Sequence, residues 1–330
     1  MKRLFALVVV AGFAAACSDR PAPTQPGGSP SFLDVQGTAT HIHIMPTKAQ
    51  ALGLDFARPG GGGGGKKTNT GIFYHGGPIF YQTNVVAVYW AGSTIYNGGP
   101  TPGTTGSGAA DGSLIGSFLR NLGGSPYFNI NTTYFDGTNT HAQNVVNYTG
   151  FWAANTNVPA SGASVSDAQI QAELISGFNS GAITFDQNTL YEVFSGPGVN
   201  LGGGFGTQYC AYHGHFSFNG QDVKYSAMPH DYDFPTACAA LNGSPNNDFA
   251  ADAEVNTLAH ETEETTTDED LNAWFDRRGQ ENADKCAWTF GATYTTGNGS
   301  VANMNLGGKD FLVQRNWVNA GSGGCATQYP

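Results

Sequence analysis

A long helical pattern that carries an acidic run constrains this chain most. In residues 247–269, NDFAADAEVNTLAHETEETTTDE, apolar residues recur at helical spacing, and nine of the chain's 25 acidic residues lie between Glu261 and Asp284. Like charges so close together repel unless water or a cation takes up their charge. Three interpretations are therefore open: a solvated acidic helix face, a calcium loop, or a metal-dependent active site.

The H-E-x-x-E pattern on this helix favours a metal site. On a helical wheel, Val255 and Leu258 lie opposite His260, and Glu264 lies one turn beyond His260 on the same side. In zinc peptidases the related H-E-x-x-H uses both histidines as ligands and the intervening glutamate as general base. The pattern predicts His260 and Glu264 as metal ligands and Glu261 as the catalytic base.

A third ligand is expected downstream. Glu281 and Asp284 lie 17 and 20 residues beyond Glu264, so either one could bind the ion while the other accepts a hydrogen bond from the His260 imidazole. Zinc is the expected ion, and the oxygen-rich ligand set makes manganese or calcium competitive. The D-x-D-x-D-G spacing of a calcium loop is absent. The other acids of the run are predicted to be solvated or to bind calcium: Glu263, Asp268, Glu269 and Asp270.

Two histidine pairs precede the helix. His213 and His215, in CAYHGHF, lie on one face of a predicted strand, which is either a polar edge face or places His213 in the cleft as a transition-state donor or extra ligand. The hairpin predicted around the Asn-Gly turn at 219–220 resembles the edge strand of zincins, which pairs with an extended substrate. His41 and His43, in HIHIMP, indicate a short strand, with metal binding as an alternative.

The cysteines predict disulfides. Four of them follow residue 71, and an even number in an exported chain favours two bonds. Three pairings are possible. The sequential pairing closes the shortest loops and is preferred: Cys210–Cys238 and Cys286–Cys325.

The N-terminus has the pattern of an exported protein. Residues 1–17 carry Lys2 and Arg3, an apolar run too short to span a bilayer, and small residues before Cys17, which is typical of a signal peptide. The AAAC end resembles a bacterial lipobox, so Cys17 is predicted to be lipidated, and Ser18 after it favours outer-membrane sorting. We expect an outer-membrane or cell-surface lipoprotein, with plain secretion as the alternative.

Composition divides the rest of the chain in two. Residues 18–70 are rich in Pro, Gly, Ser and Thr and contain six consecutive glycines at 60–65 followed by two lysines, which predicts a disordered tether. Residues 71–330 suit one domain with a large core. A net charge of −11 argues against nucleic acid and anionic membrane surfaces as partners. The expected partner is an extended peptide or a cell-surface polymer, with membrane contact only through the lipid anchor.

Strand and helix patterns are mixed along the domain. They predict a single α+β domain, with a zincin-like mixed sheet, an active-site helix and an irregular glycine-rich C-terminal part. The expected strands are 84–92, 127–137, 142–154, 189–198 and the hairpin 210–230; the expected helices are 111–124, 164–181 and 247–269.

Several blocks, in order from Gly77 to Cys325, resemble the phosphate-induced, EXORDIUM-like proteins: 84–92, 209–229, 260–286 and 297–325. That family is extracellular, and its biochemical activity is poorly established. The proline that often follows its Thr-Asp pair is Glu269 here. The family pattern of H-E-x-x-E, then Thr-Asp, Trp, Glu and Asp before a cysteine corresponds to His260, Glu261, Glu264, Thr267, Asp268, Trp274, Glu281, Asp284 and Cys286.

These observations lead to two functional hypotheses. The first is metal-dependent hydrolysis of a peptide bond, in which the ion polarises the carbonyl and activates water while Glu261 takes the proton. The alternative is a non-catalytic cell-surface binding or signalling protein of the EXORDIUM-like family, with a structural metal site.

Overall fold

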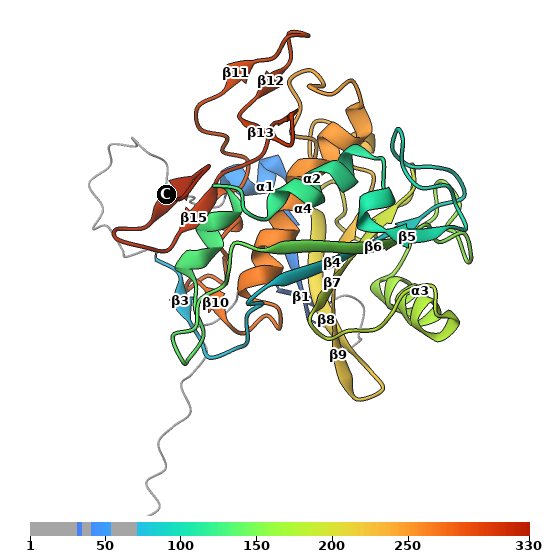
Figure 1. Ribbon diagram of the computed structural model, residues 1–330, viewed down its shortest axis with the longest axis horizontal. Coiled ribbons are helices and arrows are strands. Elements are labelled where there is room, and N and C mark those ends of the chain that lie inside the picture. Colours follow the sequence, from blue (N-terminus) through green and yellow to red (C-terminus); the bar gives the residue numbers. More distant parts are fainter. Residues whose placement is uncertain (1–31, 35–40, 54–70) are drawn as a thin grey trace, which may run out of the picture.

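The described residues of the computed structural model form a mixed sheet of eight strands (Figure 1). The structure describes residues 32–34, 41–53 and 71–330, so the predicted signal peptide and Cys17 lie outside it. The strand order is β1-β2-β8-β9-β7-β4-β6-β5. The strands are β1 (Phe32–Asp34), β2 (His41–Pro46), β4 (Thr83–Trp90), β5 (Thr105–Ser107), β6 (Val146–Trp152), β7 (Thr189–Ser195), β8 (Tyr209–Phe218) and β9 (Gln221–Met228). The predicted α+β single domain is confirmed.

The centre of the sheet is parallel and its edges are antiparallel. Strand β4 runs parallel to β6 and β7, and β7 runs parallel to β9. Seven of the eight residues of β4 are buried, as expected for a parallel strand that is covered on both faces. This arrangement explains why residues 84–92 read as a continuous apolar run.

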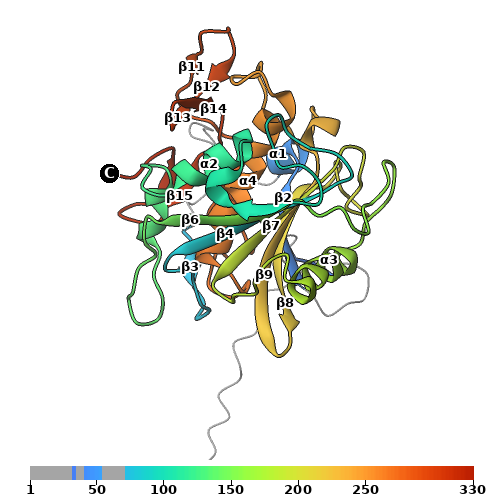
Figure 2. The same ribbon diagram turned by 45° about the vertical axis from the view of Figure 1, so that its right-hand side comes forward.

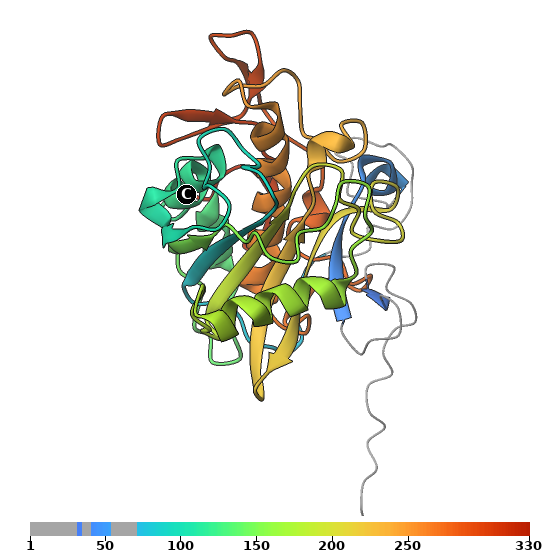
Figure 3. The same ribbon diagram turned by 90° about the vertical axis from the view of Figure 1, so that its right-hand side faces the viewer.

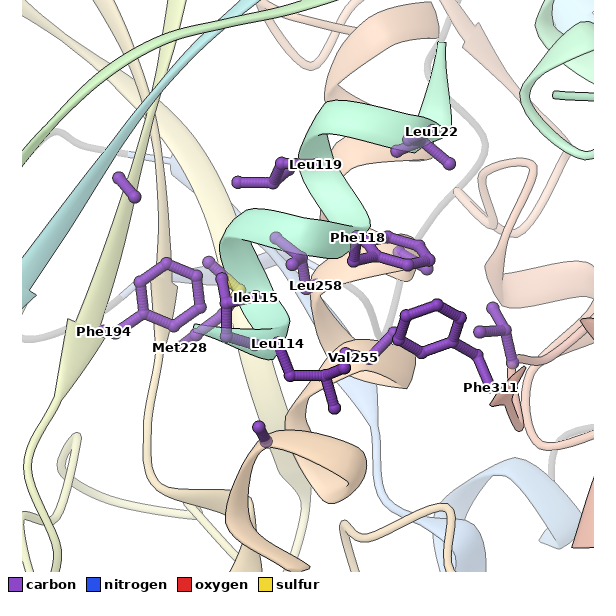
Figure 4. Close-up of a cluster of buried hydrophobic side chains, with 14 of the residues drawn as sticks. Leu114, Ile115, Phe118, Leu119, Leu122, Phe194, Met228, Val255, Leu258 and Phe311 are labelled. Atoms are coloured by element: carbon purple, nitrogen blue, oxygen red, sulfur yellow. The ribbon is translucent and has the colours of Figure 1, made fainter. Parts of the chain in front are cut away.

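Helices cover both faces of the sheet. Helices α2 (Leu114–Leu122) and α4 (Phe249–Thr267) lie on one face, and α3 (Asp167–Ser180) lies on the other (Figures 2 and 3). Ser113 caps α2 by accepting a hydrogen bond from the Gly116 amide. Leu114 and Phe118 of α2 belong to the same buried cluster as Val255 of α4 (Figure 4). Helix α4 is thus held between α2 and the sheet.

Helix α3 and the β8–β9 hairpin form where the sequence predicts them. Ser166 and Gln169 form a reciprocal capping box at the start of α3, and Gly181 ends it at a φ of 73°. Strands β8 and β9 pair around Asn219 and Gly220, whose φ values of 52° and 75° are those of a type I′ turn. Capping side chains and turn residues therefore determine where α3 begins and ends and where the hairpin turns.

Helix α4 does not have the solvated face that its acids suggested. Asp248 caps it by accepting from the Ala251 amide, and every residue from Ala251 to Thr267 is buried. Of the two alternatives predicted for Glu263 and Asp268, solvation and calcium binding, solvation is wrong, because both residues are 0% exposed. One oxygen of each carboxylate accepts hydrogen bonds: Asn316 donates to Glu263 at 2.5 Å, and two backbone amides donate to Asp268.

Two segments differ from prediction. The strand expected at 127–137 is a 3₁₀ helix, η2 (Phe128–Thr133), where the hydroxyls of Thr132 and Thr133 donate to carbonyls three residues back. Such local bonds compete with strand pairing. Within the predicted tether, the structure describes β1, β2 and a short helix, α1 (Lys48–Gly53). The strand at HIHIMP therefore exists and belongs to the main sheet.

The C-terminal part is irregular, as predicted, and consists mainly of two-stranded ribbons. Both sequential disulfides are present, Cys210–Cys238 and Cys286–Cys325, and bonds of this kind form in exported proteins. Among the described helices, none has the length and apolar character to cross a membrane. The paired short strands are β3 (Phe73–Tyr74) with β10 (Trp274–Phe275), β11 (Tyr294–Thr295) with β12 (Val301–Ala302), β13 (Met304–Leu306) with β14 (Lys309–Phe311), and β15 (Asn316–Val318) with β16 (Gly324–Ala326).

Candidate functional site

Three histidines and four carboxylates meet in the interior between α4 and the sheet. Helix α4 supplies one histidine and two glutamates, β8 and β2 supply one histidine each, and the segment after β10 supplies the other two acids. All seven residues are at most 2% exposed. We call them the inner cluster: His43, His213, His260, Glu261, Glu264, Glu281 and Asp284.

Glu264 lies at the centre of the inner cluster. Its Oε1 is 3.1 Å from Nε2 of His260, and its Oε2 is 3.6 Å from Nε2 of His43 and 3.8 Å from Nδ1 of His213. The 3.1 Å contact is the one expected from the one-turn spacing of His260 and Glu264 on α4. The structure therefore brings the two predicted helix ligands together and adds two histidines from the sheet.

Both downstream acids reach the inner cluster, where the sequence left a choice between them. Asp284 approaches His43 at 2.8 Å and His260 at 3.6 Å. Glu281 approaches His43 at 3.2 Å and His213 at 3.7 Å. Asp284 begins the 3₁₀ helix η4 (Asp284–Cys286), which ends at a disulfide-bonded cysteine. That bond anchors the segment from the C-terminal side.

The donor atoms of the inner cluster fit a divalent cation. They form three overlapping groups of ligand atoms, each within 4.8 Å, and Glu264 belongs to all three. Several of these atoms are buried without a hydrogen-bond partner, and each such atom costs about 1–3 kcal/mol. A cation bound in any one of the three groups would contact the buried ligand atoms of that group. The atoms that make no hydrogen bond of acceptable geometry include His213 Nε2, His260 Nε2, Glu261 Oε1, Glu264 Oε2, Asp284 Oδ1 and both carboxylate oxygens of Glu281.

Burial and charge oppose each other at the histidines. Burial lowers the pKa of His43, but the carboxylates of Asp284 and Glu264 outweigh it and raise that pKa to about 9. Burial, with the nearby His43 and His260, holds the pKa of His213 well below its usual value. Burial, with the neighbouring carboxylates, also raises the pKa of Glu281. Protons on His43 and Glu281 thus balance charge that a cation would otherwise balance.

Glu261, the predicted base, pairs with the predicted donor His213. Its Oε2 lies 3.0 Å from Nδ1 of His213. Burial and the neighbouring Glu264 raise the pKa of Glu261 well above its usual value, while His213 is held neutral. The two side chains therefore share one transferable proton beside the possible cation ligands.

The sequence analysis named one residue of the site only as an alternative and missed another. His43 was only an alternative ligand, because nothing in HIHIMP places it beside α4. Gln314 was missed: its Nε2 is 3.1 Å from Nδ1 of His260 and 2.9 Å from the carbonyl of Ala283. By donating to Nδ1, Gln314 leaves the proton of a neutral His260 on Nε2, facing Glu264. A cation at Nε2 would displace that proton.

Other predicted polar residues lie away from the inner cluster. His215 is partly exposed and contacts Asp222 at 3.0 Å, while Lys224 contacts both Asp222 and Asp270. We call these four residues the outer group. Glu269 instead lines a surface hollow of about 690 Å³ that contains no inner-cluster side chain. Residues that are close in sequence, on the β8–β9 hairpin and at the end of α4, therefore lie in different environments.

A model of a known protein family matches part of this region. The family model described as microbial transglutaminase matches residues 206–325, a little over a third of the 330-residue chain. This segment contains all of the inner cluster except His43. No curated protein and no solved structure matches the chain, so the zincin-like character of the sheet stays a prediction.

This match corrects the identification made from sequence. It overturns the resemblance to the EXORDIUM-like family, and with it both the metal-dependent peptidase and the non-catalytic signalling protein of that family. The error has a physical basis: H-E-x-x-E reports only that a histidine and a carboxylate lie one turn apart on a helix. That spacing identifies a possible pair of metal ligands, but it does not identify the reaction that the protein catalyses.

The cysteines limit how this chain could transfer acyl groups. All four in the matched segment form disulfides, so the described residues offer no free thiol. A thiolate is the usual attacking group in covalent acyl transfer by cysteine enzymes. The Glu261–His213 pair and the ligand atoms around Glu264 lie within the matched segment.

Proposed function

We propose that this chain is an acyl transferase that moves the acyl group of a carboxamide to an amine. The observation that carries the proposal is the position of the Glu261–His213 proton pair inside the segment matched by the microbial transglutaminase model. The name of that family indicates a glutamine side chain as acyl donor and an amine as acceptor.

The reaction exchanges one amine for another. The acceptor R′–NH₂ attacks the carbonyl carbon of R–CO–NH₂, a C–N bond forms, and the C–N bond to the original nitrogen breaks to release NH₃. The acceptor loses one proton and the leaving nitrogen gains one. Glu261 and His213, 3.0 Å apart, give their shared proton to the leaving nitrogen and take the proton of the acceptor in its place. No oxidant or free thiol is required.

A divalent cation completes the site in this proposal. His260, Glu264 and Asp284 would hold it, with His43, His213 and Glu281 within reach. When bound, the cation supplies positive charge that polarises the carboxamide carbonyl. The carboxylate-rich ligand set suits manganese or calcium as well as zinc, so the ion has to be identified by experiment.

The test is a transfer assay with a fluorescent primary amine and a glutamine-containing peptide. Labelled peptide and released ammonia are measured with and without chelator. Each measurement is made on the intact chain and on a chain cut by protease within residues 60–65, because the inner cluster is buried in the structure. The proposal predicts equal amounts of label and ammonia, both dependent on the cation and on Glu261. Absence of labelled peptide from both cation-loaded forms would contradict it.

The lipid anchor at Cys17 belongs to the same proposal. An exported enzyme held at a membrane surface by Cys17 would act on proteins or polymers at that surface. The intact chain should partition into detergent, and Cys17→Ser should release it or block its processing. Soluble export of the unchanged chain would leave a plain signal peptide.

A further inference from the structure

Two surface hollows meet at Asn84, near the start of β4. The first has a volume of about 690 Å³ and lies where β3 and β4 pass the C-terminal end of α4 (Figure 1). The second has a volume of about 520 Å³ and is lined by β4, β5, β6 and the start of β7. Each volume is in the range of small-molecule sites, roughly 300–1,000 Å³. Because Asn84 lines both hollows, a ligand longer than one of them could extend into the other.

The lining of both hollows is polar but lacks positive charge. Among the described residues, no Lys, Arg or His lines either hollow, so a phosphate, sulfate or carboxylate on a ligand would find no basic partner there. Amide and hydroxyl side chains predominate instead, and these groups both donate and accept hydrogen bonds. Such a lining favours an uncharged ligand with many hydroxyl groups. The amides include Gln82, Gln143 and Asn188 in the first hollow, and the hydroxyls include Thr105, Thr149 and Thr184 in the second.

Tyr81 gives the first hollow an aromatic ring that is already held in place. The residue is 42% exposed, and its hydroxyl donates to Asp136 at 2.5 Å. The other oxygen of Asp136 accepts hydrogen bonds from Thr138 and from the Thr140 amide. A sugar ring has an apolar C–H face that packs against an aromatic ring, while its hydroxyls lie at the edge. A tyrosine that is ordered before binding loses little conformational entropy when a sugar packs on it.

Glu269 adds a buried acid to the same hollow. The residue is 8% exposed, and no described group donates a hydrogen bond to its carboxyl. Burial raises the pKa of Glu269 to about 7, so at neutral pH the group is a carboxylate in some molecules and a neutral carboxyl in others. A sugar hydroxyl can donate to the first form and accept from the second. An ammonium group would pair only with the first, which favours a sugar over an amine.

We propose that the two hollows bind a neutral polysaccharide, with one sugar ring packed on Tyr81 and its hydroxyls bonded to Glu269 and the amides beside it. Gln82 donates to Gln143 at 2.9 Å, which leaves the side-chain carbonyl of Gln82 to accept and the amide nitrogen of Gln143 to donate. The ligand class is a chain of hexoses or N-acetylhexosamines. No inner-cluster residue lines either hollow, so this binding requires neither a cation nor acyl transfer.

The experiment measures the binding of soluble hexasaccharides to the purified full-length chain by titration calorimetry. The neutral panel contains hexamers of β-1,4-glucose, α-1,4-glucose, β-1,4-mannose, β-1,4-xylose and β-1,4-N-acetylglucosamine. The charged probes are a hexamer of galacturonate and the diamine cadaverine. We expect at least one neutral hexamer to bind, with an affinity that chelator leaves unchanged, and neither charged probe to bind as tightly.

Variants of the first hollow locate the binding. Tyr81→Ala removes the aromatic face and should weaken binding about tenfold or more, whereas Tyr81→Phe keeps the face and should bind within about threefold of the unchanged chain. Glu269→Leu should weaken binding about tenfold, because it removes a hydrogen bond to a carboxyl group. The matched control is Tyr294→Ala, which should have no effect. Tyr294 is also 42% exposed and also donates to an aspartate, Asp310, but it lines neither hollow.

Three results would overturn the inference. The first is that no neutral hexamer of the panel binds. The second is that a hexamer binds and both Tyr81→Ala and Glu269→Leu leave its affinity unchanged, which would place the sugar elsewhere on the molecule. The third is that cadaverine binds more tightly than every hexamer, which would identify the first hollow as a site for an organic cation.

Discussion

The β8–β9 hairpin supplies His213 to the inner cluster and His215, Asp222 and Lys224 to the outer group. The two sets of residues offer similar ligands, yet their surroundings differ. The outer group places His215, Asp222 and Asp270 around Lys224, with all three ligand side chains partly exposed. The inner cluster has three histidines and four carboxylates, all buried, and no lysine or arginine contacts those carboxylates in the part of the chain that the structure describes.

The contrast teaches that counting acids does not locate a site. In the outer group a lysine and water balance the charge, so the carboxylates require nothing more. In the inner cluster, burial removes water and several ligand atoms have no hydrogen bond. Unpaired buried charge is costly, and only protons or a cation can offset it there. The predictions below compare the two groups under matched changes.

The largest effect is expected from Glu264→Gln, matched by Asp222→Asn in the outer group. Glu264 belongs to all three groups of inner-cluster ligand atoms, and the amide keeps its shape while removing its charge. Binding of zinc, manganese or calcium, measured by titration calorimetry, should weaken roughly 100-fold or more for Glu264→Gln. Asp222→Asn should bind like the unchanged protein. Equal losses in the two variants would mean that the groups are equivalent.

Glu261→Gln should separate catalysis from cation binding. Glu261 contacts His213 at 3.0 Å. The side-chain amide of the glutamine that replaces it cannot take a proton from an amine. The rate of acyl transfer should fall about 100-fold or more, as for the loss of a general base, while the cation affinity changes little. His215→Ala, on the same hairpin, should retain the full rate. A Glu261→Gln protein that keeps its rate would remove this residue from the mechanism.

The stability of chelated protein should fall as the pH rises from about 6.5 to 9. His43 has a pKa of about 9 in the folded chain against 6.5 for the free side chain, so the folded state holds the extra proton in this window. The expected loss is about 3 kcal/mol, measured by urea unfolding at each pH. Cation-loaded protein should show a much smaller slope, because the cation replaces the proton. A flat profile for chelated protein would contradict the charge balance assigned to His43.

The smallest effect is expected from opening the disulfide beside Asp284. Replacing both Cys286 and Cys325 with serine removes the covalent anchor of the segment that carries Glu281 and Asp284, so cation affinity should fall about tenfold. The matched pair is Cys210 and Cys238, whose replacement should lower stability by about 2–4 kcal/mol and leave affinity nearly unchanged. Equal affinities in both double variants would show that the disulfide does not position Asp284.

Sequence reasoning found the parts of the site that are local in the chain. The one-turn spacing of His260 and Glu264, the hairpin turn at 219–220 and the caps of α3 depend on neighbouring residues, and all three are present. It missed what depends on distant contacts. His43 meets Asp284 across 241 positions, Gln314 reaches His260 across 54, and the burial of Glu263 depends on the covering C-terminal part. No local pattern encodes these approaches.

The central claim is that the inner cluster binds one divalent cation, and elemental analysis of the purified protein tests it most directly. The account predicts about one equivalent of a divalent ion per chain, removed by chelator, restored on adding the ion back, and absent from Glu264→Gln while retained in Asp222→Asn. A protein that binds no divalent ion under these conditions, or a Glu264→Gln variant that carries as much as the unchanged chain, would contradict it.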